Sequence, residues 1–233
     1  MSKILVVGDS FMSCDKKYPG QHWSEMLTNH EVVNLSEPGA SNVCIASQLI
    51  QGLELNPDYI FIGFTSLGRI EYDIEQHQRV QYNKSPTFLW ATNLQKNFLN
   101  DSQLKYYQDT VKYQSIDAWQ LRESLVVGQC LQIIKDSKIP FAWSPQSYEL
   151  FHAYIMSSNA GTQLRYQPIT RKYDILSNID LAPFKIDYNL AKIWTTEYVV
   201  KGANLMDHAN FHVDQGEHQQ LFAQLVKSKF NID

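Results

Sequence analysis

Residues 3–10 read KILVVGDS, an apolar run followed directly by glycine, aspartate and serine. Such a run of β-branched residues and leucine is typical of a strand that is buried on both faces of a parallel sheet. Two similar runs follow, EVVNL at 31–35 and YIFIGF at 59–64, and helical patterns at 23–29 and 42–53 separate the three. This alternation predicts an α/β fold with a parallel sheet and right-handed crossovers.

Three more elements complete the predicted fold. We expect a long helix at 116–137, a buried strand at 139–144 and a last helix at 216–229, with Asp214 and Glu217 as its capping box. The apolar face of the long helix is predicted to consist of Trp119, Leu125, Val126, Cys130, Ile133 and Ile134. We interpret residues 1–233 as one domain with an insertion at about 69–115 and a variable aromatic segment at about 145–200.

The composition argues against several classes of function. Twenty Lys and Arg against 24 Asp and Glu give a net charge of -4, which disfavours nucleic acid or an anionic membrane as the main partner. The three cysteines, Cys14, Cys44 and Cys130, are too scattered for a disulfide framework or a zinc site. Because no signal peptide or long apolar run is present, we expect a cytoplasmic protein.

Ser10 is the first candidate for chemistry. It follows the first predicted strand, and open α/β sheets bind ligands at the carboxyl ends of their strands. Gly8 lets the backbone turn sharply at this point. If a helix follows, its N–H groups could stabilise a developing oxyanion. The alternative is that Asp9 and Ser10 only cap that helix.

A serine nucleophile needs a base, and His212 is the best candidate. It precedes the last predicted helix, where a loop can face the end of the first strand across the same rim of the sheet. With His208 and nearby acids it could alternatively form a metal cluster, but the span lacks a helical pattern, and we predict no metal and no cofactor. We place four other histidines at the surface: His22, His30, His77 and His152.

These motifs resemble those of the SGNH (GDSL-type) hydrolase superfamily, over about the first 70 and the last 40 residues. The first block is GDS at 8–10, with Ser10 as nucleophile. The segment NLSEPGA at 34–40 is similar to the second block, in which Gly39 would give its N–H to the oxyanion hole. The segment PDYIFIGFTS at 57–66 resembles the strand before the third block. NFHVDQGEH at 210–218 is similar to the last block, with His212 as general base.

The resemblance implies a three-layer α/β/α sandwich of flavodoxin-like topology, with a mostly parallel central sheet and helical and loop insertions. Two departures from the family pattern concern the active site. The third block normally supplies an oxyanion-binding asparagine, but FTSLGR at 64–69 contains none. Thr65 or Ser66 could donate a hydroxyl instead, and Arg69 could add positive charge. Loss of one oxyanion donor typically lowers turnover by about 100- to 1000-fold.

The second departure removes the acid of the catalytic triad. Ala209 stands where the family has an aspartate three residues before the histidine. Asp207 is the candidate carboxylate, and a backbone carbonyl in its place would give a Ser-His dyad. Because the acid orients and stabilises the base without taking its proton, its loss slows the reaction and does not forbid it.

The resemblance therefore implies a serine esterase that cleaves a small acyl ester. A carbohydrate O-acetyl group is one candidate, because Gln-, Asn- and Tyr-rich segments suit sugar hydroxyls better than a long acyl chain, and the same composition also suits a protein-facing surface. Transfer of the acyl group to another acceptor would use the same residues. The alternative is a weak or inactive protein of the same fold that binds a protein partner. The opening residues are also similar to SGNH-type proteins of tailed phages and some marine bacteria, and a phage-encoded protein could be virion-associated.

Overall fold

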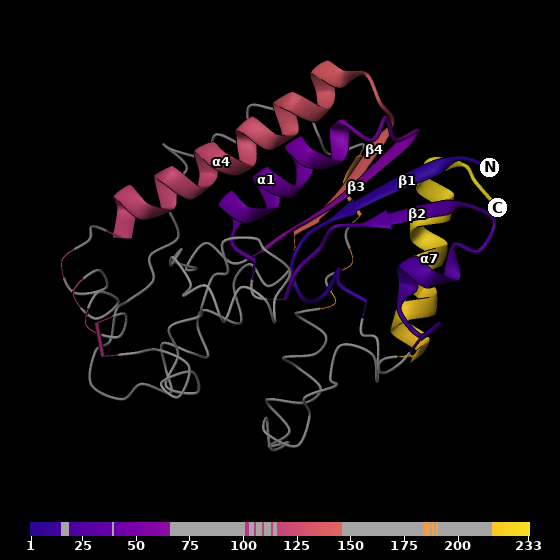
Figure 1. Ribbon diagram of the computed structural model, residues 1–233, viewed down its shortest axis with the longest axis horizontal. Coiled ribbons are helices and arrows are strands. Elements are labelled where there is room, and N and C mark those ends of the chain that lie inside the picture. The colour runs from indigo at the N-terminus through magenta and orange to yellow at the C-terminus, as the bar shows by residue number, and fades with distance from the viewer. Residues whose placement is uncertain are drawn as a thin grey trace.

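The computed structural model describes residues 1–14, 19–38, 40–65, 116–145, 184–186 and 216–233, and the single positions 101, 102, 105, 109, 113, 188 and 190. Over these residues the elements follow one another along the chain as shown in Figure 1. They are β1 (Lys3–Val7), the 3-10 helix η1 (Trp23–Met26), β2 (Glu31–Asn34), α1 (Asn42–Leu53), β3 (Tyr59–Phe64), α4 (Ile116–Ser137), β4 (Phe141–Pro145) and α7 (Gly216–Phe230).

The four strands form a parallel sheet in the order β2-β1-β3-β4. On one side of β1, Val6 pairs with Asn34 of β2, and on its other side Val7 pairs with Ile62 of β3. This order is that of a doubly wound α/β fold, in which ligands bind at the carboxyl edge of the sheet. The predicted α/β class is therefore confirmed, and Ser10 follows the strand that lies between β2 and β3.

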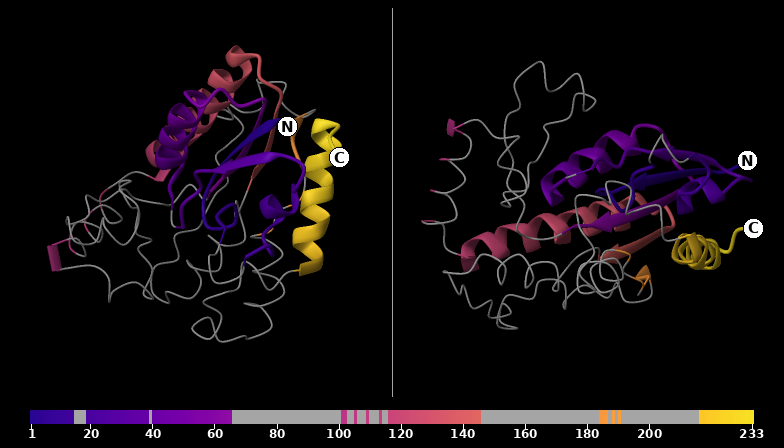
Figure 2. Two further views of the ribbon diagram at one scale, coloured as in Figure 1. Left: turned by 45° about the vertical axis from the view of Figure 1, so that its right-hand side comes forward. Right: turned by 90° about the horizontal axis from the view of Figure 1, so that it is seen from below.

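Helices cover both faces of this sheet, as Figures 1 and 2 show. Leu5, Val7 and Ile62 pack toward α1 and α4, whereas Ile4 and Phe61 pack toward η1 and α7. Since successive side chains of a strand point to opposite faces, each strand contributes to two separate apolar cores. The arrangement is the predicted three-layer sandwich.

Three aromatic rings join the second helical layer to the sheet. The ring centroid of Trp23 in η1 lies 5.0 Å from that of Phe61 in β3 and 5.1 Å from that of Phe222 in α7. Phe61 and Phe222 are themselves in edge contact at 5.5 Å. Edge-to-face packing of this kind is favourable beyond the area that it buries. The backbone N–H of Trp23 also donates to Oε1 of Gln219, at 2.9 Å.

A short extension continues the sheet beyond β4. Trp143 forms an isolated parallel bridge with Lys185, and the N–H of Ile186 donates to the carbonyl of Trp143 at 2.8 Å. The sequence analysis assigned no strand between 145 and 200. The only local signal is the short apolar pair around Lys185, which is too brief for a period of two to be recognised.

The predicted bounds of α1, β3 and α4 are confirmed to the residue. The expected helix at 23–29 is shorter, because the backbone leaves the helical region at Leu27, with φ -86° and ψ 53°. The predicted apolar face of α4 is wrong at Leu125, which is 53% exposed. Val127 and Leu131 face the core instead, since they share a helical stripe with Cys130 and Ile134.

The sequence pattern of α1 likewise includes apolar residues that do not face the core. Ile45 and Leu49 are buried, whereas Val43 and Ile50, which share the apolar pattern of the sequence, are exposed.

The predicted insertion at 69–115, the segment at 145–200 and the cap at Asp214 lie wholly or almost wholly outside the described residues, so the domain organisation stays a prediction. None of the helices in the described part is long and apolar enough to cross a membrane.

Gly8 is required by packing. A Cβ at this position would lie 2.7 Å from Cβ of Met12 and 3.0 Å from the carbonyl oxygen of Gly63. We expect Gly8→Ala to lower the free energy of unfolding by about 1–3 kcal/mol, because a buried neighbour and the backbone must both shift. Gly216→Ala is the control, since nothing lies within 4 Å of its added Cβ. Denaturant titration of both variants checks this, and equal stabilities would contradict it.

Candidate functional site

Buried polar residues gather at the carboxyl edge of the sheet. Asp9 follows β1, Thr65 follows β3 and Ser144 lies near the end of β4, and all three are completely buried. A polar side chain is costly to bury unless it forms hydrogen bonds. The contacts of these residues therefore show how this edge is organised around Ser10.

Ser10 lies in a tight turn and is partly buried. The carboxylate Oδ1 of Asp9 accepts the N–H of Phe11 at 3.0 Å, and the backbone carbonyl of Asp9 accepts the N–H of Met12 at 3.0 Å. No helix starts in the described residues 8–14, so Asp9 and Ser10 do not cap a helix there. Asp9 closes a turn instead, with Ser10 in it.

The entry to this turn is fixed on two sides. The N–H of Gly8 donates to Oε1 of Gln48 in α1 at 2.9 Å, and its carbonyl accepts the N–H of Glu37 at 3.2 Å. Gln48 is itself buried. The backbone N–H and the carbonyl of Gly8 are thus both bonded to residues outside the turn. These two bonds fix the direction in which the chain runs from β1 to Ser10.

The exit of the turn is fixed by His22 and Asn34. Nε2 of His22 lies 3.1 Å from the carbonyl oxygen of Phe11, and Nδ2 of Asn34 donates to the carbonyl of Met12 at 2.7 Å. Because a carbonyl can only accept, Nε2 of His22 carries the proton, and Nδ1 accepts from Ser24, whose hydroxyl is 2.8 Å away. The expectation that His22 lies at the surface is wrong: its side chain caps η1 and is fully buried.

Burial lowers the pKa of His22 to about 4, and it outweighs the hydrogen bond to Phe11, which acts in the opposite direction. In the unfolded chain the pKa returns to its ordinary value of about 6.5. The unfolded state therefore binds more protons between pH 6.5 and pH 4, and stability is lost as the pH falls through this range.

We expect His22 to contribute an acid-dependent loss on the order of 3 kcal/mol between these limits. Unfolding titrations at several pH values test it, with His22→Gln as the comparison. Gln keeps an amide donor but does not titrate, so the slope of stability against pH should be flatter in that variant. Equal slopes would show that another group causes the acid sensitivity.

Cys14 and His22 do not form a thiolate–imidazolium pair. Sγ of Cys14 lies 3.7 Å from Nδ1 of His22, close enough to suggest a second nucleophile. However, burial raises the pKa of the Cys14 thiol, and the pKa of His22 is lowered. Both groups are therefore neutral at physiological pH, and the reactive form of a cysteine is the thiolate.

The end of β3 carries a second polar cluster. The hydroxyl of Thr65 donates to Oδ2 of Asp9 at 2.7 Å, and the side-chain amide of Asn42 bonds to the backbone of Thr65. Glu123 of α4 accepts from Asn42 in turn, at 3.2 Å. The single proton of the Thr65 hydroxyl is thus bonded to Asp9. While this bond is present, the hydroxyl cannot donate to an oxyanion as predicted.

The roles of Asn42 and Glu123 were not predicted from the sequence. A signal for Glu123 was present, because it falls on the helical stripe of Val127, Cys130 and Ile134. An acid on an apolar stripe indicates a buried carboxylate with a partner. Asn42 had no comparable signal, since asparagine is ordinary in the first turn of a helix.

Only two of the predicted site residues are described by the structure. Ser10 and Thr65 follow the adjacent strands β1 and β3. Gly39, Ser66, Asp207 and His212 lie outside the described residues, so their roles stay predictions. Within the described ranges, no group of three His, Cys, Asp or Glu side chains could hold a metal ion.

His218 is fixed by an aromatic neighbour. The hydroxyl of Tyr188 lies 2.6 Å from Nδ1 of His218, and the backbone carbonyl of Tyr188 accepts the hydroxyl of Ser144 at 3.0 Å. These two bonds connect α7 to the end of β4.

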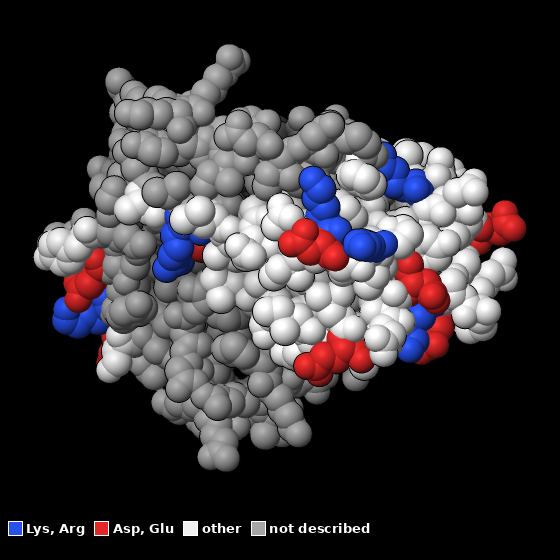
Figure 3. Space-filling model, turned by 90° about the horizontal axis from the view of Figure 1, so that it is seen from above, with Lys and Arg blue, Asp and Glu red and all other residues white. Residues whose placement is uncertain are grey.

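On the face shown in Figure 3, acidic and basic side chains lie interspersed over the described part, without a large basic patch.

No protein-family model and no curated protein matches the chain. Solved structures with a similar fold include the psychrotrophic esterase EstA of Pseudoalteromonas sp., inhibited by monoethylphosphonate, with a TM-score of 0.46, 9% identity and coverage of 99% of this chain and 97% of that chain. LAE5, an alpha/beta hydrolase from the metagenome of Lake Arreo, has a TM-score of 0.44, 11% identity and coverage of 99% and 95%. TesA has a TM-score of 0.38, 16% identity and coverage of 98% and 97%.

Proposed function

We propose that this protein is a serine hydrolase of the SGNH type that cleaves a small acyl ester. The observation that carries the proposal is the position of Ser10. It lies in a turn that is bonded on both sides, directly after strand β1, at the edge where this fold binds ligands. The family motif GDS at 8–10 assigns the nucleophile to this same residue.

The reaction would proceed through an acyl-enzyme. Oγ of Ser10 attacks the ester carbonyl while His212 takes its proton, and the alcohol leaves with that proton. Water then attacks the acyl carbonyl while His212 takes its proton, the bond between the acyl group and Oγ of Ser10 breaks, and His212 returns the proton to Oγ as the acid leaves. Asp207 is the proposed carboxylate that orients His212, and a backbone carbonyl in that role would leave a Ser-His dyad. No metal or cofactor enters these steps.

The oxyanion would be held by the N–H groups of Ser10 and Gly39 and by one hydroxyl. The bond from Thr65 to Asp9 favours Ser66 as the hydroxyl donor, because a hydroxyl has a single proton and that of Thr65 is in use. Thr65 could serve only if its proton left Asp9. A carbohydrate O-acetyl group remains the proposed substrate, since the Gln-, Asn- and Tyr-rich segments suit sugar hydroxyls.

The second candidate is a weak or inactive protein of the same fold that binds a protein partner. The sequence FTSLGR at 64–69, without the oxyanion asparagine of the family, favours it. The two candidates differ in the reactivity of Ser10, because only a hydrolase needs an activated serine.

Labelling with a fluorophosphonate separates these two candidates. We expect one adduct on the wild-type protein by intact mass, and none on Ser10→Ala or His212→Ala, because the probe reacts only with a serine that a base has activated. Acetylated sugars would then be screened as substrates. A wild-type protein that carries no adduct would contradict the hydrolase and favour the binding protein.

A further inference from the structure

Asn42 binds the backbone of Thr65 as a neighbouring strand would. Its Oδ1 accepts the N–H of Thr65 at 3.0 Å, and its Nδ2 donates to the carbonyl of the same residue at 3.3 Å. A side-chain amide carries a donor and an acceptor side by side, which matches the two backbone groups of one extended residue. Asn42, the first residue of α1, thereby holds the chain where β3 has ended.

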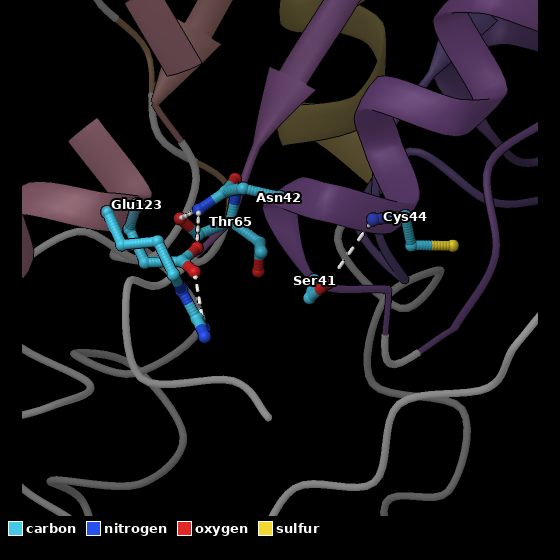
Figure 4. Close-up of polar contacts among 6 residues, drawn as sticks. Ser41, Asn42, Cys44, Thr65 and Glu123 are labelled. Carbon is cyan, nitrogen blue, oxygen red and sulfur yellow. Dashed lines mark hydrogen bonds and ion pairs between the residues drawn. The ribbon is translucent and has the colours of Figure 1, made fainter. Parts of the chain in front are cut away.

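Glu123 fixes the orientation of that amide. Its carboxylate accepts the second N–H of Asn42 at 3.2 Å and the guanidinium of Arg122 at 3.0 Å, and its side chain is fully buried. If the amide were turned over, its oxygen would face the carboxylate and its NH₂ would face the N–H of Thr65. Both contacts would be repulsive, so the buried carboxylate permits only the orientation that binds Thr65. Figure 4 shows Asn42, Thr65 and Glu123 converging from α1, the end of β3 and α4.

The chain of hydrogen bonds continues to the turn that contains Ser10. The hydroxyl of Thr65 donates to Asp9 at 2.7 Å, and the same carboxylate accepts the N–H of Phe11. Hydrogen bonds thus connect Glu123, Asn42, Thr65 and Asp9, all of which are completely buried. The last of these residues is adjacent to Ser10 in sequence. Buried polar side chains that are hydrogen-bonded to one another rigidify the groups that they join.

We infer that Asn42 and Glu123 are positioning residues of the hydrolase site. They hold the end of β3, which leads into the predicted oxyanion donors, at a fixed place beside the turn of Ser10. This inference rests on the proposed function. Neither residue is proposed to contact substrate, because the amide and carboxylate atoms named above bind protein groups. Their loss should therefore lower kcat and leave KM unchanged.

The kinetic test uses Asn42→Ala, Glu123→Leu and the conservative variant Glu123→Gln. A misplacement of about 1 Å can lower turnover by about 100-fold, so we expect kcat for p-nitrophenyl acetate to fall by about 10- to 100-fold in the first two variants. Glu123→Gln keeps an acceptor for the amide of Asn42 and should retain most of the activity. Ile45→Val is the control: it trims a buried apolar residue of the same helix that makes no side-chain hydrogen bond, and it should leave kcat unchanged.

Two readouts separate failure of this inference from failure of the hydrolase assignment. If wild type reacts with fluorophosphonate and folded Asn42→Ala reacts at the same rate, the positioning role is wrong. If wild type does not react, the hydrolase is wrong, and hydrogen exchange of the Thr65 and Phe11 amides decides the coupling. Exchange that is about tenfold faster at both amides in Asn42→Ala supports it, and unchanged exchange overturns it. Glu123→Leu, which also removes the acceptor for the amide of Asn42, serves where Asn42→Ala does not fold.

Discussion

Ser10→Ala should lower the rate of p-nitrophenyl acetate hydrolysis by about 10⁴-fold or more, to the level of the remaining binding groups. Alanine removes the oxygen that attacks the carbonyl and leaves the backbone of the turn in place. That turn is held through Gly8, Asp9 and Phe11, none of which uses the Ser10 side chain. The loss should therefore appear in kcat without a change in the free energy of unfolding, as measured by initial rates and denaturant titration.

Ser13→Ala is the matched control for this substitution. Ser13 lies three residues further along the same loop and is also partly exposed, so its variant should hydrolyse the ester at the wild-type rate. A Ser10→Ala protein that is as active as wild type would remove Ser10 from the mechanism. A parallel loss in both variants would show that the loop as a whole, and not the Ser10 hydroxyl, limits the reaction.

The fold could be predicted because its signals are local. Each central strand, such as Lys3–Val7 or Tyr59–Phe64, is an apolar run bounded by turn residues. In the helices between the strands, apolar residues recur at intervals of three or four. The position of Ser10 follows from the same pattern, since a residue after a parallel strand must lie at the carboxyl edge of the sheet. No knowledge of side-chain contacts was needed for either inference.

The polar cluster could not be predicted in this way. Thr65 and Asp9 are 56 residues apart, and Asn42 and Glu123 are 81 residues apart. Their contacts depend on the register between strands and on how α1 and α4 pack, neither of which leaves a local pattern. His22 shows the related limit for burial. Its sequence neighbours showed no motif and suggested the surface, but its ring donates to the carbonyl of Phe11 and caps η1, so the interior is favoured.

Phe222→Ala should have the largest effect on stability. The ring is completely buried and contacts both Trp23 of η1 and Phe61 of β3, so it joins α7 to the 3-10 helix and to the sheet. Truncation of a buried phenylalanine costs about 3–5 kcal/mol, because transfer energy is lost and a cavity remains. Natural domains are stable by only about 5–15 kcal/mol, so a large share of the total would disappear. We expect the Tm to fall by about 6 to 20 °C in a thermal scan.

Leu221→Ala provides the comparison on the same helix. Leu221 precedes Phe222 but is 42% exposed, so its truncation removes little buried area and should change the free energy of unfolding by less than about 1 kcal/mol. Equal losses in the two variants would mean that the aromatic contact contributes no more to the stability of α7 than a half-exposed leucine does. A large loss confined to Phe222→Ala would show that the contact with Trp23 and Phe61 secures α7. Since His212 precedes α7 by only a few residues, the docking of α7 also bears on where the proposed base can lie.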